Sequence, residues 1–143
     1  MKNLTASKIV FILSGIYDGF LGAAFLLFPE KLFAHFGVTP PNHWGYVQFA
    51  AAILLIFTLM FFAVAANPRA NRNLIPYGFL LKLAYASTVF WYWAGPGIPN
   101  MWKPFAVADA IFAIAFVWCW LSLGSPDAAT TDSAMRRQDR GVA

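Results

Sequence analysis

Residues 9–28 read IVFILSGIYDGFLGAAFLLF, a long apolar run that carries a single charged side chain, Asp18. A helix of about 20 apolar residues is long enough to cross the hydrocarbon core of a bilayer. Pro29 follows the run and marks the end of the predicted helix. A cleavable signal peptide is disfavoured, because the run is long, holds a carboxylate near its middle and lacks a small-residue cleavage site after it. We therefore interpret residues 9–28 as a retained transmembrane helix.

The whole chain has the composition of a membrane protein. Of its 143 residues, 60% are hydrophobic, 18% are aromatic and 11% are charged, whereas an ordinary soluble domain carries about 25% charged residues. Three further apolar stretches are long enough to span a bilayer, and proline, glycine or asparagine residues separate them. The predicted spans are residues 9–28, 45–66, 74–94 and 105–124.

The short connections make sequential helices antiparallel neighbours. The sequence therefore predicts an all-α fold, an integral membrane up-down-up-down four-helix bundle within residues 1–124. Residues 125–143 are polar and rich in small side chains, which predicts a disordered cytoplasmic tail. Gly15 and Gly19 lie one turn apart on the first helix, so they favour close packing within the bundle or, alternatively, a dimer contact.

The distribution of Lys and Arg predicts the orientation, because short cytoplasmic loops carry an excess of both. Lys31 and Lys103 fall on one side of the predicted spans. Seven basic residues fall on the other side: Lys2, Lys8, Arg69, Arg72, Arg136, Arg137 and Arg140. Both termini and the loop of residues 67–73 are therefore expected in the cytoplasm.

The first outer loop, residues 29–44, is expected to contain a short helix at Glu30–Phe36. Leu32, Phe33 and Phe36 share one face of it, so we expect the helix to lie flat in the outer membrane interface. Tyr and Trp near the span ends predict an aromatic belt at the outer surface. Its members are Trp44, Tyr46, Trp91, Tyr92, Trp93 and Trp102.

Charged residues within spans are costly and usually face the interior of a helix bundle. Asp18 and Lys82 lie at similar depths, about 13 Å and about 12 Å from the cytoplasmic ends of their helices. We expect a buried ion pair that joins the first and third spans. The pair either fixes helix register or forms a proton or ligand site. In an alternative, Lys82 extends to the cytoplasmic headgroups and Asp18 is left protonated.

Other polar residues extend this candidate site. Tyr17 adjoins Asp18, and Lys82, Tyr85 and Tyr92 share one stripe of the third span. This stripe is either an ordinary interior face or a polar pocket for a small headgroup such as a quinone ring. Nearer the outer surface, a second polar cluster is expected. Its predicted members are Gln48, Tyr92, Asp109 and Lys103.

No pattern of catalytic or metal-binding residues is found in the sequence. Cys119 is the single cysteine, so neither an intrachain disulfide nor a cysteine metal site can form. His35 and His43 have no third ligand nearby, and we expect no metal. No phosphate-binding loop or Ser-His-Asp set is present. Enzymatic activity is therefore not expected.

The first helix is rich in glycine and has a Phe-Pro exit, Gly15–Pro29, and three strings stand out in the rest of the chain: NHWGYVQF at 42–49, NRNLIPYG at 71–78 and MWKPF at 101–105. In its length, four spans, cytoplasmic termini and first helix, the chain resembles small four-helix bacterial membrane proteins of the DoxX-like type. The three strings resemble those of uncharacterised bacterial membrane proteins. The resemblance implies the bacterial inner (cytoplasmic) membrane and a context of quinone-linked sulfur oxidation or redox stress. It carries over no catalytic residue.

Three functions are compatible with these observations. The favoured one is an accessory or assembly subunit of a larger membrane complex, with the bilayer and a membrane protein or a second copy as partners. The alternative is a redox-associated protein that binds a quinone or a lipid along Lys82 and Tyr85. A third is an oligomer that conducts protons or small solutes through Asp18 and Lys82. Nucleic acid is not an expected partner.

Overall fold

The computed structural model describes residues 2–124 of the chain, and these residues form helices without any strand. The predicted tail, residues 125–143, lies outside the described residues. The helices are α1 (Lys2–Leu27), α2 (Pro29–His35), α3 (Gly45–Ala66), α4 (Ile75–Ala94) and α5 (Lys103–Ser122), with 3₁₀ turns η1 (Arg72–Leu74) and η2 (Asn100–Trp102). The helices α1, α3, α4 and α5 are long and apolar enough to cross a membrane, which confirms a long apolar helix at each of the four predicted positions and suggests a multi-pass membrane protein.

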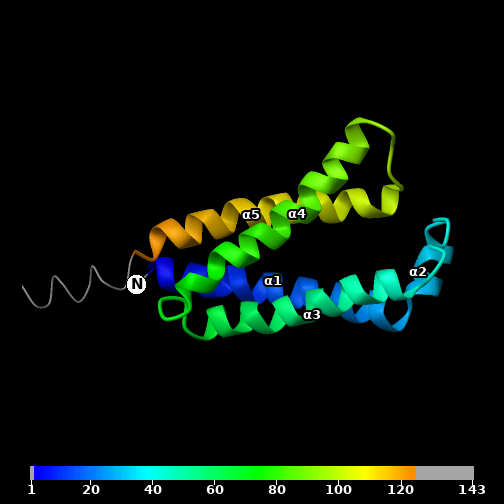
Figure 1. Ribbon diagram of the computed structural model, residues 1–143. Helices are drawn as coiled ribbons and strands as arrows, with labels where there is room; N and C mark the ends of the chain where they lie inside the picture. Colours follow the sequence, from blue (N-terminus) through cyan, green and yellow to red (C-terminus); the bar gives the residue numbers. More distant parts are fainter. Residues whose placement is uncertain (1, 125–143) are drawn as a thin grey trace, which may run out of the picture.

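The long helices pack as two pairs (Figure 1). α1 lies along α3, and α4 lies along α5. α1 and α5 join the pairs, whereas α3 and α4 contact each other little although they are consecutive. The expectation that every helix packs on its successor is therefore wrong for α3 and α4. α4 leans away from α3 toward the end of the molecule that carries α2, and this leaves room between them (Figure 1).

Glycines allow the close approach of α1 to α3. A Cβ atom on Gly15 would lie 2.8 Å from the ring of Phe62, and one on Gly19 would lie 3.1 Å from Thr58 Cγ2. A Cβ on Gly22 would lie 3.0 Å from the backbone oxygen of Ala51. The favoured interpretation of Gly15 and Gly19, packing within the chain, agrees with these contacts.

Two apolar clusters close the two ends of the helix assembly. At the end with the N-terminus, the rings of Phe11 and Phe116 stack, the ring of Phe61 lies tilted against both, and all three are fully buried. At the other end, Phe33 of α2 packs edge-on against the rings of Trp44 and Trp102. The short helix predicted at Glu30–Phe36 is thus confirmed, one residue earlier, as Pro29–His35. Of the residues on its predicted apolar face, Phe33 is buried and Phe36 is exposed.

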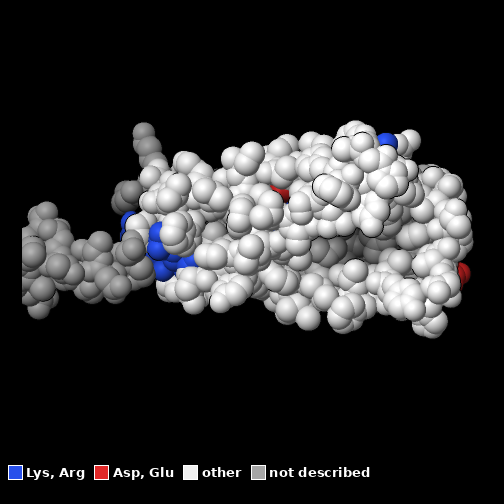
Figure 2. All heavy atoms as spheres, turned by 45° about the horizontal axis from the view of Figure 1, so that its top comes forward, with Lys and Arg blue, Asp and Glu red and all other residues white. Residues whose placement is uncertain are grey.

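The outer surface is apolar along most of its length. Phe20, Trp91 and Ile114 are each more than 70% exposed, which is the pattern of side chains that face lipid. Figure 2 shows Lys and Arg side chains gathered at one end of the molecule, beside a long middle that is nearly free of charge. Lys8, Arg69 and Arg72 belong to this end, and Lys31 and Lys103 to the other.

Candidate functional site

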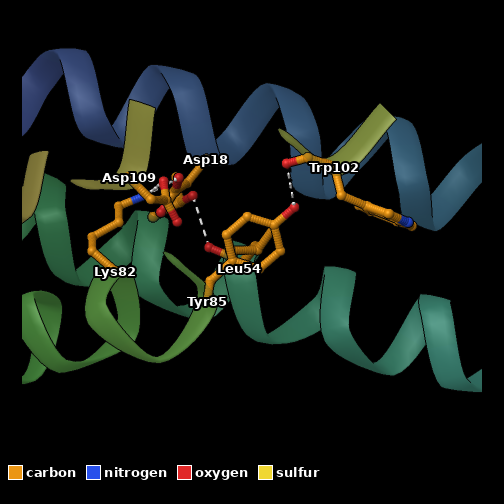
Figure 3. Close-up of polar contacts among 7 residues, drawn as sticks. Asp18, Leu54, Lys82, Tyr85, Trp102 and Asp109 are labelled. Atoms are coloured by element: carbon orange, nitrogen blue, oxygen red, sulfur yellow. Dashed lines mark hydrogen bonds and ion pairs between the residues drawn. The ribbon is translucent and has the colours of Figure 1, made fainter. Parts of the chain in front are cut away.

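A buried triad of charged residues joins three helices. Lys82 Nζ of α4 donates hydrogen bonds to Oδ1 of Asp18 on α1 and to Oδ1 of Asp109 on α5, at 2.5 Å and 2.9 Å (Figure 3). Lys82 is 0% exposed, Asp18 1% and Asp109 6%. The expected ion pair between Asp18 and Lys82 is present, and the alternative in which Lys82 extends to the headgroups is wrong.

Aromatic rings enclose the ammonium group. The ring centroids of Tyr17, Phe112 and Phe61 lie 5.1 Å, 5.4 Å and 5.8 Å from Lys82 Nζ. Rings at such distances attract a cation through their negative faces. Two carboxylates and three ring faces therefore surround Lys82, which leaves this ammonium little capacity for a further partner.

A cavity of about 550 Å³ opens from the triad toward the end that carries α2. Asp18 and Asp109 lie at one end of the cavity, and Tyr46 and Trp102 lie toward the other. Its walls come from all four long helices and are mostly apolar: Leu21, Phe25, Val47, Ala50, Ala51, Ile53, Leu54, Leu81, Val89, Ile98 and Phe105. Ala50 and Thr88 are exposed on either side of the gap between α3 and α4, and Figure 2 shows the molecule hollowed there.

Three buried polar atoms near the triad have no hydrogen-bond partner in the described part of the chain. They are Asp18 Oδ2, Tyr17 Oη and Ser14 Oγ. Such groups are costly to bury unless something satisfies them. Asp18 and Tyr17 both line the cavity, so a molecule in it could supply the missing partner.

Tyr85 lines the cavity wall, but its hydroxyl is already engaged. Tyr85 Oη donates to the backbone oxygen of Trp102 at 3.2 Å, which ties α4 to the turn before α5 (Figure 3). Of the tyrosines predicted for the site, Tyr17 and Tyr85 lie at the cavity. Tyr92 is 47% exposed and is not part of it.

The predicted outer cluster of polar residues does not form. Asp109 joins Lys82, whereas Gln48 Nε2 donates to the backbone oxygen of Leu26. Lys103 Nζ donates to Asn100 Oδ1 and lies over the ring of Trp93. The prediction was wrong because the depth of a backbone position does not fix where a long side chain ends: Figure 3 shows the ammonium of Lys82 meeting the carboxylates of Asp18 and Asp109.

Sequence reasoning missed the cavity wall. Ala50, Leu54 and Phe105 line the cavity, yet each is an ordinary residue of an apolar helix, and nothing in the pattern distinguishes it from its neighbours. Within residues 2–124, no three His, Cys, Asp or Glu side chains are placed to hold a metal ion. Comparisons with known protein families, with curated proteins and with solved structures find no match to this chain.

Proposed function

We propose that this protein binds a lipid-soluble amphipathic molecule within the membrane, with the polar head of that molecule at the Asp18–Lys82–Asp109 triad. One observation carries the proposal: an apolar cavity of about 550 Å³ ends on a buried set of charged groups. Small-molecule sites are typically concave, mostly apolar and about 300–1,000 Å³ in volume, with a few polar groups that orient the ligand. The opening between α3 and α4 gives such a molecule a route from the lipid.

We also propose a membrane topology for the four long helices. Four helices span the bilayer up-down-up-down, with both termini and the α3–α4 turn in the cytoplasm of a bacterial cell and α2 at the outer face of its inner membrane. The gathering of Lys8, Arg69 and Arg72 at one end supports this orientation. In this arrangement the cavity extends from mid-membrane toward the outer leaflet.

This proposal develops the lipid- or quinone-binding alternative in preference to an accessory subunit. The accessory role, proton or solute conduction and the DoxX-like relationship remain predictions from the sequence. The cavity and its polar end, by contrast, are specific features that a ligand explains.

The test measures binding of phenylbutanol, a small amphiphile with a neutral head, to the protein in lipid nanodiscs. Ala50→Trp places an indole in the cavity, whereas the matched control Ala63→Trp places one on the exposed side of the same helix, outside the cavity. We expect saturable binding to wild type and to Ala63→Trp, and a loss of about tenfold or more in Ala50→Trp, the equivalent of about 1.4 kcal/mol. Binding that is absent, or equal in the two tryptophan variants, would overturn the proposal.

A further inference from the structure

The polar end of the cavity offers hydrogen-bond acceptors. Lys82 is fully buried and already donates to two carboxylates. By contrast, Asp18 Oδ2 has no partner, and Asp109 keeps a small exposed area where it lines the cavity. Tyr17 Oη, also without a partner, can either accept or donate. A head group that donates hydrogen bonds therefore fits this end better than one that only accepts them, such as an oxidised quinone.

The triad also contains more acidic groups than basic ones. Two carboxylates surround one ammonium. Apart from Lys2, Lys8 and Lys103 near helix starts, the four long helices contain no other charged residue. With all three groups ionised, the centre of the protein would carry one net negative charge, and an uncompensated charge in a low-dielectric interior is strongly unfavourable. One further cation is needed for neutrality.

We propose that the cavity binds a lipophilic organic cation, an ammonium head on an apolar tail, and that this head and a proton compete for the same place at the triad. The inference rests on the proposed function and names its ligand class. The ammonium head donates to Asp18 Oδ2 and to Asp109 and lies near the ring of Tyr17. The apolar tail lies along Ala51 and Leu54 of α3. Binding releases one proton to solvent, so charge is balanced in both states.

The groups that face the triad allow this exchange. α1 contributes Tyr17 beside Asp18, and α4 contributes Tyr85 beside Lys82. α3 contributes no ionisable group at this depth, and its nearest polar side chain, Thr58, donates to its own backbone at Leu54. The two phenols are neutral, so the two carboxylates and Lys82 alone set the charge that a ligand meets.

The experiment compares three probes with one tail and different heads: phenylbutylamine, phenylbutanol and phenylbutyrate. Binding to the full-length protein in nanodiscs is measured by calorimetry, at mildly acidic and mildly alkaline pH, with empty nanodiscs as the reference. We expect the amine to bind at least about tenfold more tightly than the alcohol at alkaline pH, the value of one charge-assisted hydrogen bond. The carboxylate is expected not to bind.

The same experiment measures the exchange of a proton for the amine head. Amine affinity should rise with pH, by up to about tenfold per pH unit for exchange of one proton. Heats measured in buffers of different ionisation enthalpy should show proton release with the amine and none with the alcohol. Amine affinity that is independent of pH would overturn the exchange, and an alcohol that binds more tightly than the amine would overturn the cation preference while sparing the proposed function. Absence of binding by all three probes would overturn both.

Variants locate the effect at the triad. Asp18→Asn removes the surplus charge and leaves Lys82 paired with Asp109, so amine affinity should fall about tenfold more than alcohol affinity does and should lose its pH dependence. Asp109→Asn should act in the same way, and an unaltered size-exclusion profile shows that a variant is folded. Glu30→Gln makes the same chemical change on exposed α2, away from the cavity, and should change nothing. Unaltered amine binding in both aspartate variants would overturn the assignment.

Discussion

The ammonium of Lys82 lies 2.9 Å from a carboxylate oxygen of Asp109, and the same ammonium also binds Asp18. The pairing that the sequence predicted between Asp18 and Lys82 is thus one half of a larger unit. Three helices, α1, α4 and α5, are joined through this single nitrogen. Its removal and the removal of either carboxylate should have different consequences.

Lys82→Met should destabilise the protein more than Asp18→Asn does. The lysine variant leaves two buried carboxylates without a counter-charge, and loss of one partner of a buried pair costs about 3–5 kcal/mol. The aspartate variant keeps the pair of Lys82 and Asp109 and should cost less. Thermal unfolding in one detergent, followed by size-exclusion chromatography, ranks the variants.

Double and triple variants show whether the unit has two members or three. Asp18→Asn/Lys82→Met still buries Asp109 alone, so only part of the loss should be recovered. The triple variant that adds Asp109→Asn should recover more. Full recovery in the double variant would mean that Asp109 does not participate, and strictly additive penalties would show that the three residues are independent.

Gly78→Ala should be more damaging than Gly15→Ala. A Cβ on Gly78 would lie 2.6 Å from Phe61 and 3.2 Å from Phe116, two fully buried rings. A Cβ on Gly15 would lie 2.8 Å from Phe62, which is 41% exposed and can turn toward lipid. We expect a loss of about 1–3 kcal/mol for Gly78→Ala, as is usual for an overpacked core, and less for Gly15→Ala. The ratio of folded to unfolded protein in a denaturant series checks the order, which a larger loss for Gly15→Ala would contradict.

Arg72 is expected to hold the α3–α4 turn against the end of α5. Its Nε donates to the backbone oxygen of Trp120 at 2.8 Å, and its guanidinium lies 4.2 Å from the centre of the Trp120 ring. Arg72→Lys keeps the charge but loses the planar fork, so stability should fall by about 1 kcal/mol. Arg69→Lys, at an exposed position of the same turn, is the matched control and should leave the unfolding temperature unchanged. Equal unfolding temperatures for the two variants would show that the contact with Trp120 contributes nothing.

The proposed orientation predicts which side of the membrane each connection faces. Cys119 is fully buried, so it should resist a membrane-impermeant maleimide and give a low background. Asn73→Cys, in the α3–α4 turn, should be labelled only after the membrane is permeabilised. Thr39→Cys, between α2 and α3, should be labelled in intact spheroplasts. The reverse pattern would invert the topology and would leave the cavity assignment untouched.

Much of the fold could be predicted because each transmembrane helix must satisfy its own backbone and remain apolar over a fixed length. The four spans and the short helix after Pro29 follow from this local requirement. The pairing of α1 with α3 and of α4 with α5 could not be derived from connection lengths, since these allow α3 and α4 to pack as well. The tilt of α4 away from α3, which opens the cavity, depends on how many side chains pack together, and no single residue pattern determines it.

The residues of the candidate site could be predicted, but their grouping only in part. Asp18, Lys82 and Asp109 are conspicuous as charges in apolar helices, and all three were selected from the sequence. Their grouping was only half predicted, because counting residues along straight helices gives the depth of a backbone and not the position of a side-chain nitrogen. Gln48 and Lys103 were selected by the same depth argument, and Tyr92 also by its place on the stripe of Lys82 and Tyr85. None of the three lines the cavity.

The arrangement of the triad has a consequence for biogenesis. Lys82 and Asp109 belong to the packed pair of α4 and α5, whereas Asp18 belongs to the earlier pair of α1 and α3. As the chain emerges from the ribosome, Asp18 is synthesised 64 residues before Lys82. α4 is the least apolar of the four spans, and its lysine has one counter-charge earlier in the chain and a second in the helix that follows. The bond between Lys82 and Asp18 therefore joins two helix pairs that are synthesised one after the other.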